Sequence, residues 1–270
     1  MSFGRRLLAF PVVRLVLAVA PIVGFLVAAS KLGLPMLAAG AVVPLLYVVY
    51  VRVVERRAVA ELATAGAGLE LLRGFVIGAA LFAVTMAILR LAGVAAITRG
   101  DGWHALATGL GAAVAAALIE ETLLRAIFFR IVEESMGSVI ALLASAGLFG
   151  FLHAFNPGAT LVSTVAIALE AGVILAAAYL YTRRLWMAIG LHAAWNFTEG
   201  GIFGASVSGG VGHGLFASHF AGRPIVSGGA FGPEASVVAV VVCLIAGVAL
   251  LVQSRRLGHF RPPFWARSGR

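Results

Sequence analysis

The stretch Ala112-Ala-Val-Ala-Ala-Ala-Leu-Ile-Glu120-Glu121-Thr-Leu-Leu-Arg125 places two acidic residues and one basic residue inside a long apolar run. On insertion scales, each such residue costs roughly 2.5–3.5 kcal/mol at the centre of a membrane helix. Ionisable residues in membrane helices are therefore rare, and those that occur have partners and a function. We expect this stretch to be a membrane helix whose polar residues belong to a functional site.

The composition of the 270-residue chain is that of an integral membrane protein. Hydrophobic residues make up 61% and charged residues 11%, against about 25% charged residues in soluble domains, and the mean hydropathy is +1.05. The ten-residue segments of alternating polarity that a membrane β-barrel requires are not found in the sequence. The sequence therefore predicts an all-α, polytopic fold. Because a membrane helix needs about 20 apolar residues, we expect about eight of them, at Val12–Ser30, Leu34–Val51, Gly74–Leu91, Trp103–Ile131, Ser138–Leu152, Leu161–Tyr181, Leu185–Phe197 and Ala235–Val252.

The basic residues lie at helix ends and predict the orientation of the chain. The formal net charge is +9, but these residues form no patch interleaved with aromatic residues, so we expect no nucleic-acid partner. Cytoplasmic loops of membrane proteins are enriched in Lys and Arg. We therefore expect a multi-pass protein of the cell inner or plasma membrane with both termini cytoplasmic. This orientation leaves only four basic residues on the outer side, Lys31, Arg90, Arg99 and Arg223, and puts fifteen on the cytoplasmic side: Arg5, Arg6, Arg14, Arg52, Arg56, Arg57, Arg73, Arg130, Arg183, Arg184, Arg255, Arg256, Arg261, Arg267 and Arg270.

We expect one membrane domain with three regions. Residues 1–100 hold the N-terminal membrane helices, residues 101–204 hold the residues that can carry chemistry, and residues 205–270 hold an extracytoplasmic loop, the last membrane helix and a basic tail. The glycine-rich loop Gly200–Gly232 could cap a cavity. Cys243 is the only cysteine, so no intrachain disulfide can form, and we interpret it as a small buried side chain.

Glu121 and Arg125 stand four residues apart, which stacks them on one helix face with the glutamate N-terminal. An ion pair between them would remove much of the cost of both charges. Glu120 points about 100° away on the helix and has no opposite charge at helical spacing. It is left neutral, bound to a metal, or hydrogen-bonded to another helix, and a protonated structural carboxyl is the alternative to a functional one.

Two further polar pairs lie in apolar helices downstream. His153 follows Phe149 by four residues at the end of the fifth predicted helix, and His192 shares a face of the seventh with Asn196. Either histidine alone would more often be an interfacial or structural residue. Together with Glu120, they put acid, base and amide groups on three helices at similar depth, which predicts a common site.

These side chains suit hydrolysis of an amide bond. A carboxylate and an imidazole can bind and deprotonate water, and the protonated partner can then donate to the leaving amine. Asn196 can donate its amide to the oxyanion that develops on the scissile carbonyl. Glu120, His153 and His192 can alternatively bind one zinc ion with an open position for water. The spacing H-E-x-x-H does not occur, so we favour a site that requires no cofactor and keep zinc as the alternative.

Three motifs, Glu120-Glu121-Thr-Leu-Leu-Arg125, Phe149-Gly-Phe-Leu-His153 and His192-Ala-Ala-Trp-Asn196, resemble the E-E-x-x-x-R, F-x-x-x-H and H-x-x-x-N motifs of the CPBP family. This family, also called Abi, comprises intramembrane endopeptidases related to the CAAX prenyl protease of eukaryotes. The resemblance covers about Trp103–Phe203. It implies a conical membrane cavity open to the cytoplasm, in which Glu120 activates water beside His153 and His192, while Asn196 stabilises the oxyanion. The resemblance also implies supporting roles for three residues: Glu121, Arg125 and Phe149. Members have been described as metalloproteases and as glutamate proteases, and we favour the glutamate type.

Several polar residues lie outside the motifs. For Glu170, within the sixth predicted helix, two interpretations stay open: packing against the cavity, and an auxiliary catalytic or substrate contact. We expect Glu133 and Glu134 to form a solvated face at a helix end. We interpret the remaining histidines as interfacial or loop residues: His104, His213, His219 and His259.

Two other functions compete with an endopeptidase. Buried Glu and His residues also form the proton relays of coupled transporters, although the inverted repeats and broken helices of such transporters are not evident here. A non-enzymatic membrane scaffold or immunity protein is the third candidate. We favour an intramembrane endopeptidase whose partners are membrane lipid and a membrane-associated peptide or protein substrate.

Overall fold

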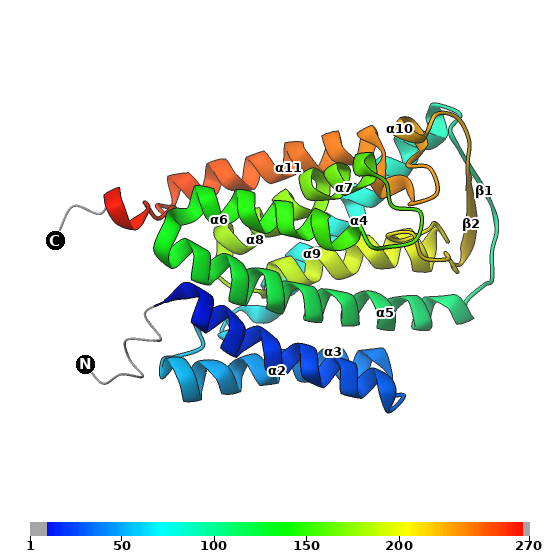
Figure 1. Cartoon of the computed structure of the whole chain (residues 1–270). Coiled ribbons are helices and arrows are strands. Elements are labelled where there is room, and N and C mark those ends of the chain that lie inside the picture. Colours follow the sequence, from blue (N-terminus) through cyan, green and yellow to red (C-terminus); the bar gives the residue numbers. More distant parts are fainter. Residues whose placement is uncertain (1–9, 267–270) are drawn as a thin grey trace.

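A bundle of long helices makes up residues 10–266, the part of the chain that the computed structural model describes (Figure 1). The elements in chain order are α2 (Pro11–Lys31), α3 (Met36–Tyr50), α4 (Ala67–Leu91), β1 (Ala95–Arg99), α5 (His104–Glu121), α6 (Arg130–His153), α7 (Leu161–Ile167), α8 (Val173–Thr182), α9 (Trp186–Asn196), β2 (Phe216–Phe220), α10 (Pro224–Ser227) and α11 (Val237–Arg256). Short 3-10 helices lie at Ala60–Leu62, Pro233–Ala235 and Phe264–Ala266. Segments of π-helix lie at Val51–Glu55, Thr122–Phe129, Ala168–Gly172 and Phe197–Ile202.

Six helical stretches within residues 10–266 are long and apolar enough to cross a membrane. The fold is therefore that of a polytopic helical membrane protein, which confirms the predicted fold class. The six stretches are Pro11–Lys31, Met36–Glu55, Ala67–Leu91, His104–His153, Leu161–Thr182 and Val237–Arg256. The seventh predicted helix corresponds to α9, and eight spans stay a prediction.

The stretch His104–His153 contains both the fourth and the fifth predicted helices. A straight helix of its 50 residues would be about 75 Å long, far more than the ~30 Å hydrocarbon core of a bilayer. Gly137 interrupts it with φ 81° and ψ 167°, a conformation that glycine adopts without steric cost. The chain reverses direction there, so that α5 and most of α6 lie alongside each other (Figure 1).

Helix α9 lies at the centre of the bundle, and every residue from Met187 to Trp195 is buried. Its packing against α4 depends on glycine, because a Cβ atom at Gly74 would lie 2.2 Å from the Met187 carbonyl oxygen and one at Gly190 would lie 2.2 Å from that of Leu71. Small residues allow membrane helices to approach each other closely. This close packing holds His192 and Asn196 in the interior.

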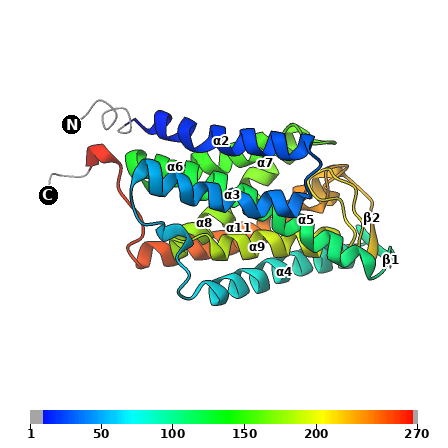
Figure 2. The ribbon, with the colours of Figure 1, turned by 90° about the horizontal axis from the view of Figure 1, so that it is seen from below.

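A two-stranded antiparallel sheet, absent from the all-α prediction, closes one end of the bundle. β1 pairs with β2 so that Ala95 lies opposite Phe220 and Arg99 opposite Phe216. Both strands lie at the end of the bundle far from the described ends of the chain (Figures 1 and 2). Five-residue strands whose partners are so distant in sequence leave no local pattern to predict them, and the pairing ties the long loop to the connection between α4 and α5.

The opposite end of the bundle carries buried ion pairs, and here the expectation of a solvated Glu133 was wrong. The Glu133 side chain is fully buried and accepts hydrogen bonds from Arg183 Nη1 (2.8 Å) and Nη2 (2.6 Å) and from Ser138 Oγ (2.5 Å). Glu134 is partly exposed and pairs with Arg14 and Arg130. Arg183 is 50 residues away, so sequence proximity to Arg130 alone could not reveal the burial of Glu133.

Candidate active site

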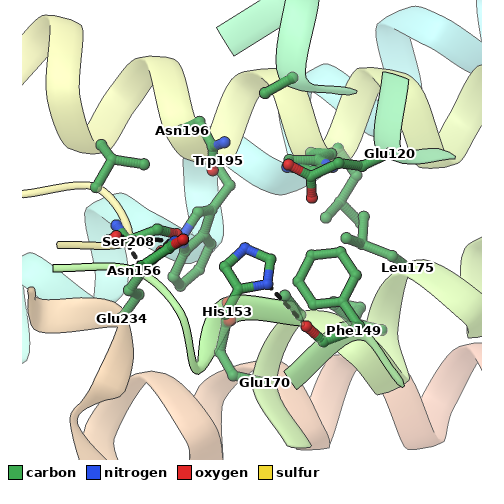
Figure 3. Close-up of a pocket in the computed structure, with 16 residues that line it drawn as sticks. Glu120, Phe149, His153, Asn156, Glu170, Leu175, Trp195, Asn196, Ser208 and Glu234 are labelled. Carbon is green, nitrogen blue, oxygen red and sulfur yellow. Dashed lines mark hydrogen bonds between the residues drawn. The ribbon is translucent and has the colours of Figure 1, made fainter. Parts of the chain in front are cut away.

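All four residues predicted to be catalytic line one cavity of about 140 Å³ (Figure 3). Glu120 comes from α5, His153 from the end of α6, and His192 and Asn196 from α9. The cavity also contains Phe149 and Glu170. The structure thus brings together side chains from three helices that the sequence could only place at similar depth.

His192 is held by the ion pair that the sequence predicted. Arg125 Nη1 lies 3.1 Å from Glu121 Oε1, with both side chains fully buried, and the same oxygen lies 2.9 Å from His192 Nδ1. A carboxylate paired with arginine accepts hydrogen bonds, so Nδ1 of His192 carries the proton. Its Nε2 is then the nitrogen left for the cavity.

His153 is held in the same tautomer by a different partner. Its Nδ1 lies 2.8 Å from the carbonyl oxygen of Phe149, and a carbonyl can only accept, so Nδ1 is again the donor. The imidazole stacks on the Phe149 ring with centroids 4.6 Å apart and planes at 20°. Phe149 also meets the His192 ring edge-on at 6.1 Å and lies under the Arg125 guanidinium at 4.8 Å. One phenylalanine therefore positions three of the polar side chains.

Glu120 faces the cavity from the wall opposite His153. Its Oε2 is shielded from solvent and has no hydrogen-bond partner within residues 10–266. Figure 3 shows the ring of His153 pointing into the space between Glu120 and Asn196. A buried carboxylate oxygen without a partner is costly, and water or a substrate group in this space would supply the missing hydrogen bond.

Comparison with protein families shows what this site is similar to. Residues 102–198 match the family described as type II CAAX prenyl endopeptidase Rce1-like, and this segment contains all three motifs. This segment of the chain is similar to the Rce1-like family. This match confirms the resemblance recognised from the motifs and supports an intramembrane endopeptidase of the CAAX type. Searches among curated proteins and among solved structures gave no match.

The wall of the cavity nearest α11 consists largely of residues that the sequence analysis missed. Glu234 Oε1 accepts hydrogen bonds from the backbone N–H of Ser208 (2.6 Å) and from its hydroxyl (2.9 Å). Asn156 Nδ2 donates to the carbonyl oxygen of Ser208 at 3.1 Å. Ser208 and Val207 belong to the glycine-rich loop, which does line the cavity. Burial raises the pKa of Glu234 above its ordinary value, although His153 and the Ser208 hydrogen bonds act in the opposite direction.

Glu170 lies in the cavity wall within a π-helical segment. It is buried, and one oxygen accepts a hydrogen bond from the thiol of Cys243 at 3.4 Å, while the other has no partner in the described part of the chain. Three of the π-helical segments begin beside or contain residues of the candidate site: they follow Glu121, contain Glu170 and follow Asn196. Such segments recur at functional sites, where they change the direction of a side chain.

A second cavity, of about 620 Å³, adjoins the first. The two share Ala116, Asn196 and Val207 as lining residues. The remaining wall is made mostly of the first turns of α5 and of the loop after α9, with His104, His213 and Asp101 at its polar edge. We call this second cavity the vestibule.

The candidate zinc ligands Glu120, His153 and His192 surround the first cavity without forming a metal centre. No group of three or more His, Cys, Asp or Glu side chains within residues 10–266 lies close enough together to hold a metal ion. In the geometry that they adopt, Glu120, His153 and His192 do not form such a group, and zinc stays the alternative. The chemistry proposed below uses protein groups and water alone.

Proposed function

We propose that the protein is an intramembrane endopeptidase in which Glu120 activates the water that attacks a peptide bond. The observation that carries the proposal is the unpartnered, buried oxygen of Glu120 in the cavity that His153, His192 and Asn196 also line. A carboxylate there accepts a hydrogen bond from water and then its proton. The substrate is a peptide or protein associated with the membrane.

The other steps of hydrolysis are carried out by His153, His192 and Asn196. The bound water donates one hydrogen to Glu120 and the other to Nε2 of His153 or His192, which orients its oxygen for attack. When the water oxygen bonds to the scissile carbon, the Asn196 amide donates to the oxyanion. Glu120, now protonated, returns that proton to the leaving amine as the carbon–nitrogen bond breaks.

Glu121, Arg125 and Phe149 act as positioning residues. Glu121 fixes the tautomer of His192, and Arg125 balances the charge of Glu121 in an interior from which water is excluded. Phe149 fixes His153 through its ring and its carbonyl oxygen. Glu170 lies in the cavity wall and can contact the substrate.

The exposed side chains and the distribution of charge support a location in a membrane and a set of partners. Large apolar side chains on the outer faces of the helices, among them Val12, Val76 and Ile245, are exposed and suit contact with lipid. Membrane lipid and the peptide substrate are the proposed partners, and nucleic acid is not one of them. We place the protein in the cell inner or plasma membrane with both termini cytoplasmic, and its proposed mechanism requires no cofactor.

Cleavage of a library of quenched fluorescent peptides by purified protein in detergent tests the proposal. Glu120→Gln keeps the shape of the side chain and removes the base, so we expect cleavage to fall by about 10²–10⁴-fold. Glu134→Gln is the matched control, because Glu134 lies far from the cavity in the ion pairs at the other end of the bundle. Full cleavage by Glu120→Gln would reject the mechanism. Cleavage that survives a zinc chelator would support the glutamate type, and cleavage lost with the chelator would establish the metal type.

A proton-coupled transporter is the second candidate, because of one observation. Glu199, like Glu170, is buried, and it interacts in the interior with a third buried carboxyl, that of Glu234. Buried carboxyls of this kind form proton relays in transporters. Proton flux in protein-containing liposomes that persists in Glu120→Gln, with no peptide cleavage by the wild type, would favour the transporter.

A further inference from the structure

We propose that the catalytic cavity takes its substrate from the outer side of the membrane, as an extended peptide segment that passes through the vestibule. The nature of the substrate rests on the proposed endopeptidase function, whereas the direction of access rests on the shape and charge of the molecule. The substrates are then extracytoplasmic segments of membrane proteins or exported peptides.

The vestibule connects the catalytic cavity with the end of the bundle that carries the two strands. It contacts the first cavity at Ala116 and Asn196, and its far edge is formed by Asp101, His104 and His213. Asp101 and His104 stand at the beginning of α5, which starts beside β1 (Figure 1). A chain entering at this edge would move along α5 towards Glu120.

The walls of the vestibule leave room for a peptide because their residues are small. Ala112 and Ala113 of α5 line it together with Gly200 and Gly201 of the segment after α9. The two walls touch at Gly109, where a Cβ atom would lie 2.8 Å from Gly201 Cα. A cavity of 620 Å³ is within the range of about 300–1,000 Å³ that is typical of ligand sites.

Charge in the vestibule is confined to its edge. Asp101 Oδ2 and His213 Nδ1 form a hydrogen bond of 2.8 Å, and both side chains are exposed. The walls behind this pair are apolar apart from Thr108, Asn196 and backbone groups. The vestibule therefore suits a segment that is largely uncharged.

The positive charges of the protein lie at the opposite end of the bundle. Arg52 and Arg56 follow α3, Arg183 follows α8, and Arg255 and Arg256 end α11. All of these helix ends lie on the side of Figure 1 where the described chain begins and ends. Because loops rich in arginine stay in the cytoplasm, the strand-bearing end and the vestibule lie on the outer side.

Large side chains are packed closely at the arginine-rich end of the bundle. Tyr47, Phe129 and Tyr179 are completely buried there, and Phe129 packs edge-on against Tyr179 with ring centroids 5.4 Å apart. The ion pair of Arg130 with Glu55, at 2.9 Å, lies in the same region. The cavity orientation implied by the motif resemblance, open to the cytoplasm, thus differs from the one that the charges and packing of this chain indicate.

Cysteine labelling of the full chain in intact bacterial cells tests the direction of access. The wild type is the background, because its only cysteine, Cys243, is buried. Val211, beside the vestibule, is 85% exposed and Leu257, after α11, is 56% exposed, so Val211→Cys and Leu257→Cys form a matched pair of aliphatic replacements. With a membrane-impermeant maleimide, Val211→Cys should react in intact cells and Leu257→Cys only after lysis. The reverse pattern, or reaction of both in intact cells, would overturn the proposal.

A second pair of variants tests the route. Ala112→Cys, in the vestibule wall, should react from outside the cell with a small charged methanethiosulfonate. Val76→Cys, on the lipid-facing surface of α4, should not react, because a charged reagent does not enter lipid. Reaction of Ala112→Cys only after the membrane is made permeable would overturn the route. These measurements need no activity, so peptide cleavage that depends on Glu120, combined with labelling from the wrong side, would reject this inference and leave the proposed function intact.

Discussion

Glu121 and His192, 71 residues apart in the chain, share a buried hydrogen bond of 2.9 Å, and Arg125 binds the same carboxylate oxygen. This arrangement couples the stability of the bundle to the orientation of a histidine in the cavity. Removing one member of a buried ion pair costs about 3–5 kcal/mol, because the other charge is left uncompensated. We therefore expect Glu121→Gln to lower the thermal unfolding temperature and to reduce cleavage.

The double variant Glu121→Gln with Arg125→Met separates these two effects. It removes both charges from the interior, so most of the lost stability should return. Cleavage should remain low, because no carboxylate then holds His192. Thermal unfolding and peptide cleavage measured on the same samples check this. A double variant as unstable as Glu121→Gln alone would contradict the ion-pair explanation.

Phe149→Leu should reduce kcat, with a smaller effect on the unfolding temperature. Leucine keeps the carbonyl oxygen that binds His153 but removes the ring that stacks on its imidazole at 4.6 Å. Phe151→Leu is the matched control, since Phe151 is two residues away and exposed on the lipid-facing surface. Steady-state cleavage kinetics would distinguish them, and equal kcat values would show that the stacking is unimportant.

Glu234→Gln should change how stability depends on pH. The pKa of Glu234 is raised in the folded protein, so the protonated carboxyl favours folding. Its contribution to the free energy of unfolding is complete below the unfolded pKa of about 4.3. This contribution is lost as pH rises through the folded pKa. Glutamine imitates the protonated form and keeps an oxygen for Ser208. Unfolding temperatures should therefore agree at low pH, and the variant should become the more stable protein as pH rises. Parallel curves for the two proteins would contradict this.

Gly190→Ala should destabilise the contact between α4 and α9. The added Cβ atom would lie 2.2 Å from the Leu71 carbonyl oxygen, and overpacking of this kind typically costs about 1–3 kcal/mol. Gly147→Ala is the control, since nothing lies within 4 Å of a Cβ at that position of α6. There, alanine should leave stability unchanged or raise it by up to about 1 kcal/mol. Unfolding temperatures of both variants in detergent provide the check.

The sequence predicted those parts of the site that depend on helical spacing. The pairing of Glu121 with Arg125 and the common face of His192 and Asn196 both follow from a four-residue separation within one helix. Apolar length predicted a helical membrane protein, and the glycine at 137 stands where the fourth predicted helix gives way to the fifth.

What the sequence did not predict are contacts between distant segments. Glu234 stands in a turn before α11, and only the folding of the glycine-rich loop brings it to Ser208. Glu133 is buried because Arg183 reaches it from another helix. Neither contact produces a periodic pattern in the sequence, because each depends on how distant segments pack and not on the spacing of residues within one helix.

The pairing of β1 with β2 also has a consequence for how the protein is assembled. Ala95 and Phe220 can come together only after every helix from α5 to α9 has been synthesised, because these helices lie between them in the chain. Contacts of such long sequence separation form late, because closing the intervening chain costs entropy before the contact stabilises it. During synthesis, the two histidines and Glu120 can therefore meet before the glycine-rich loop is held by the strand pairing, and the cavity acquires its last wall only as the final third of the chain is translated.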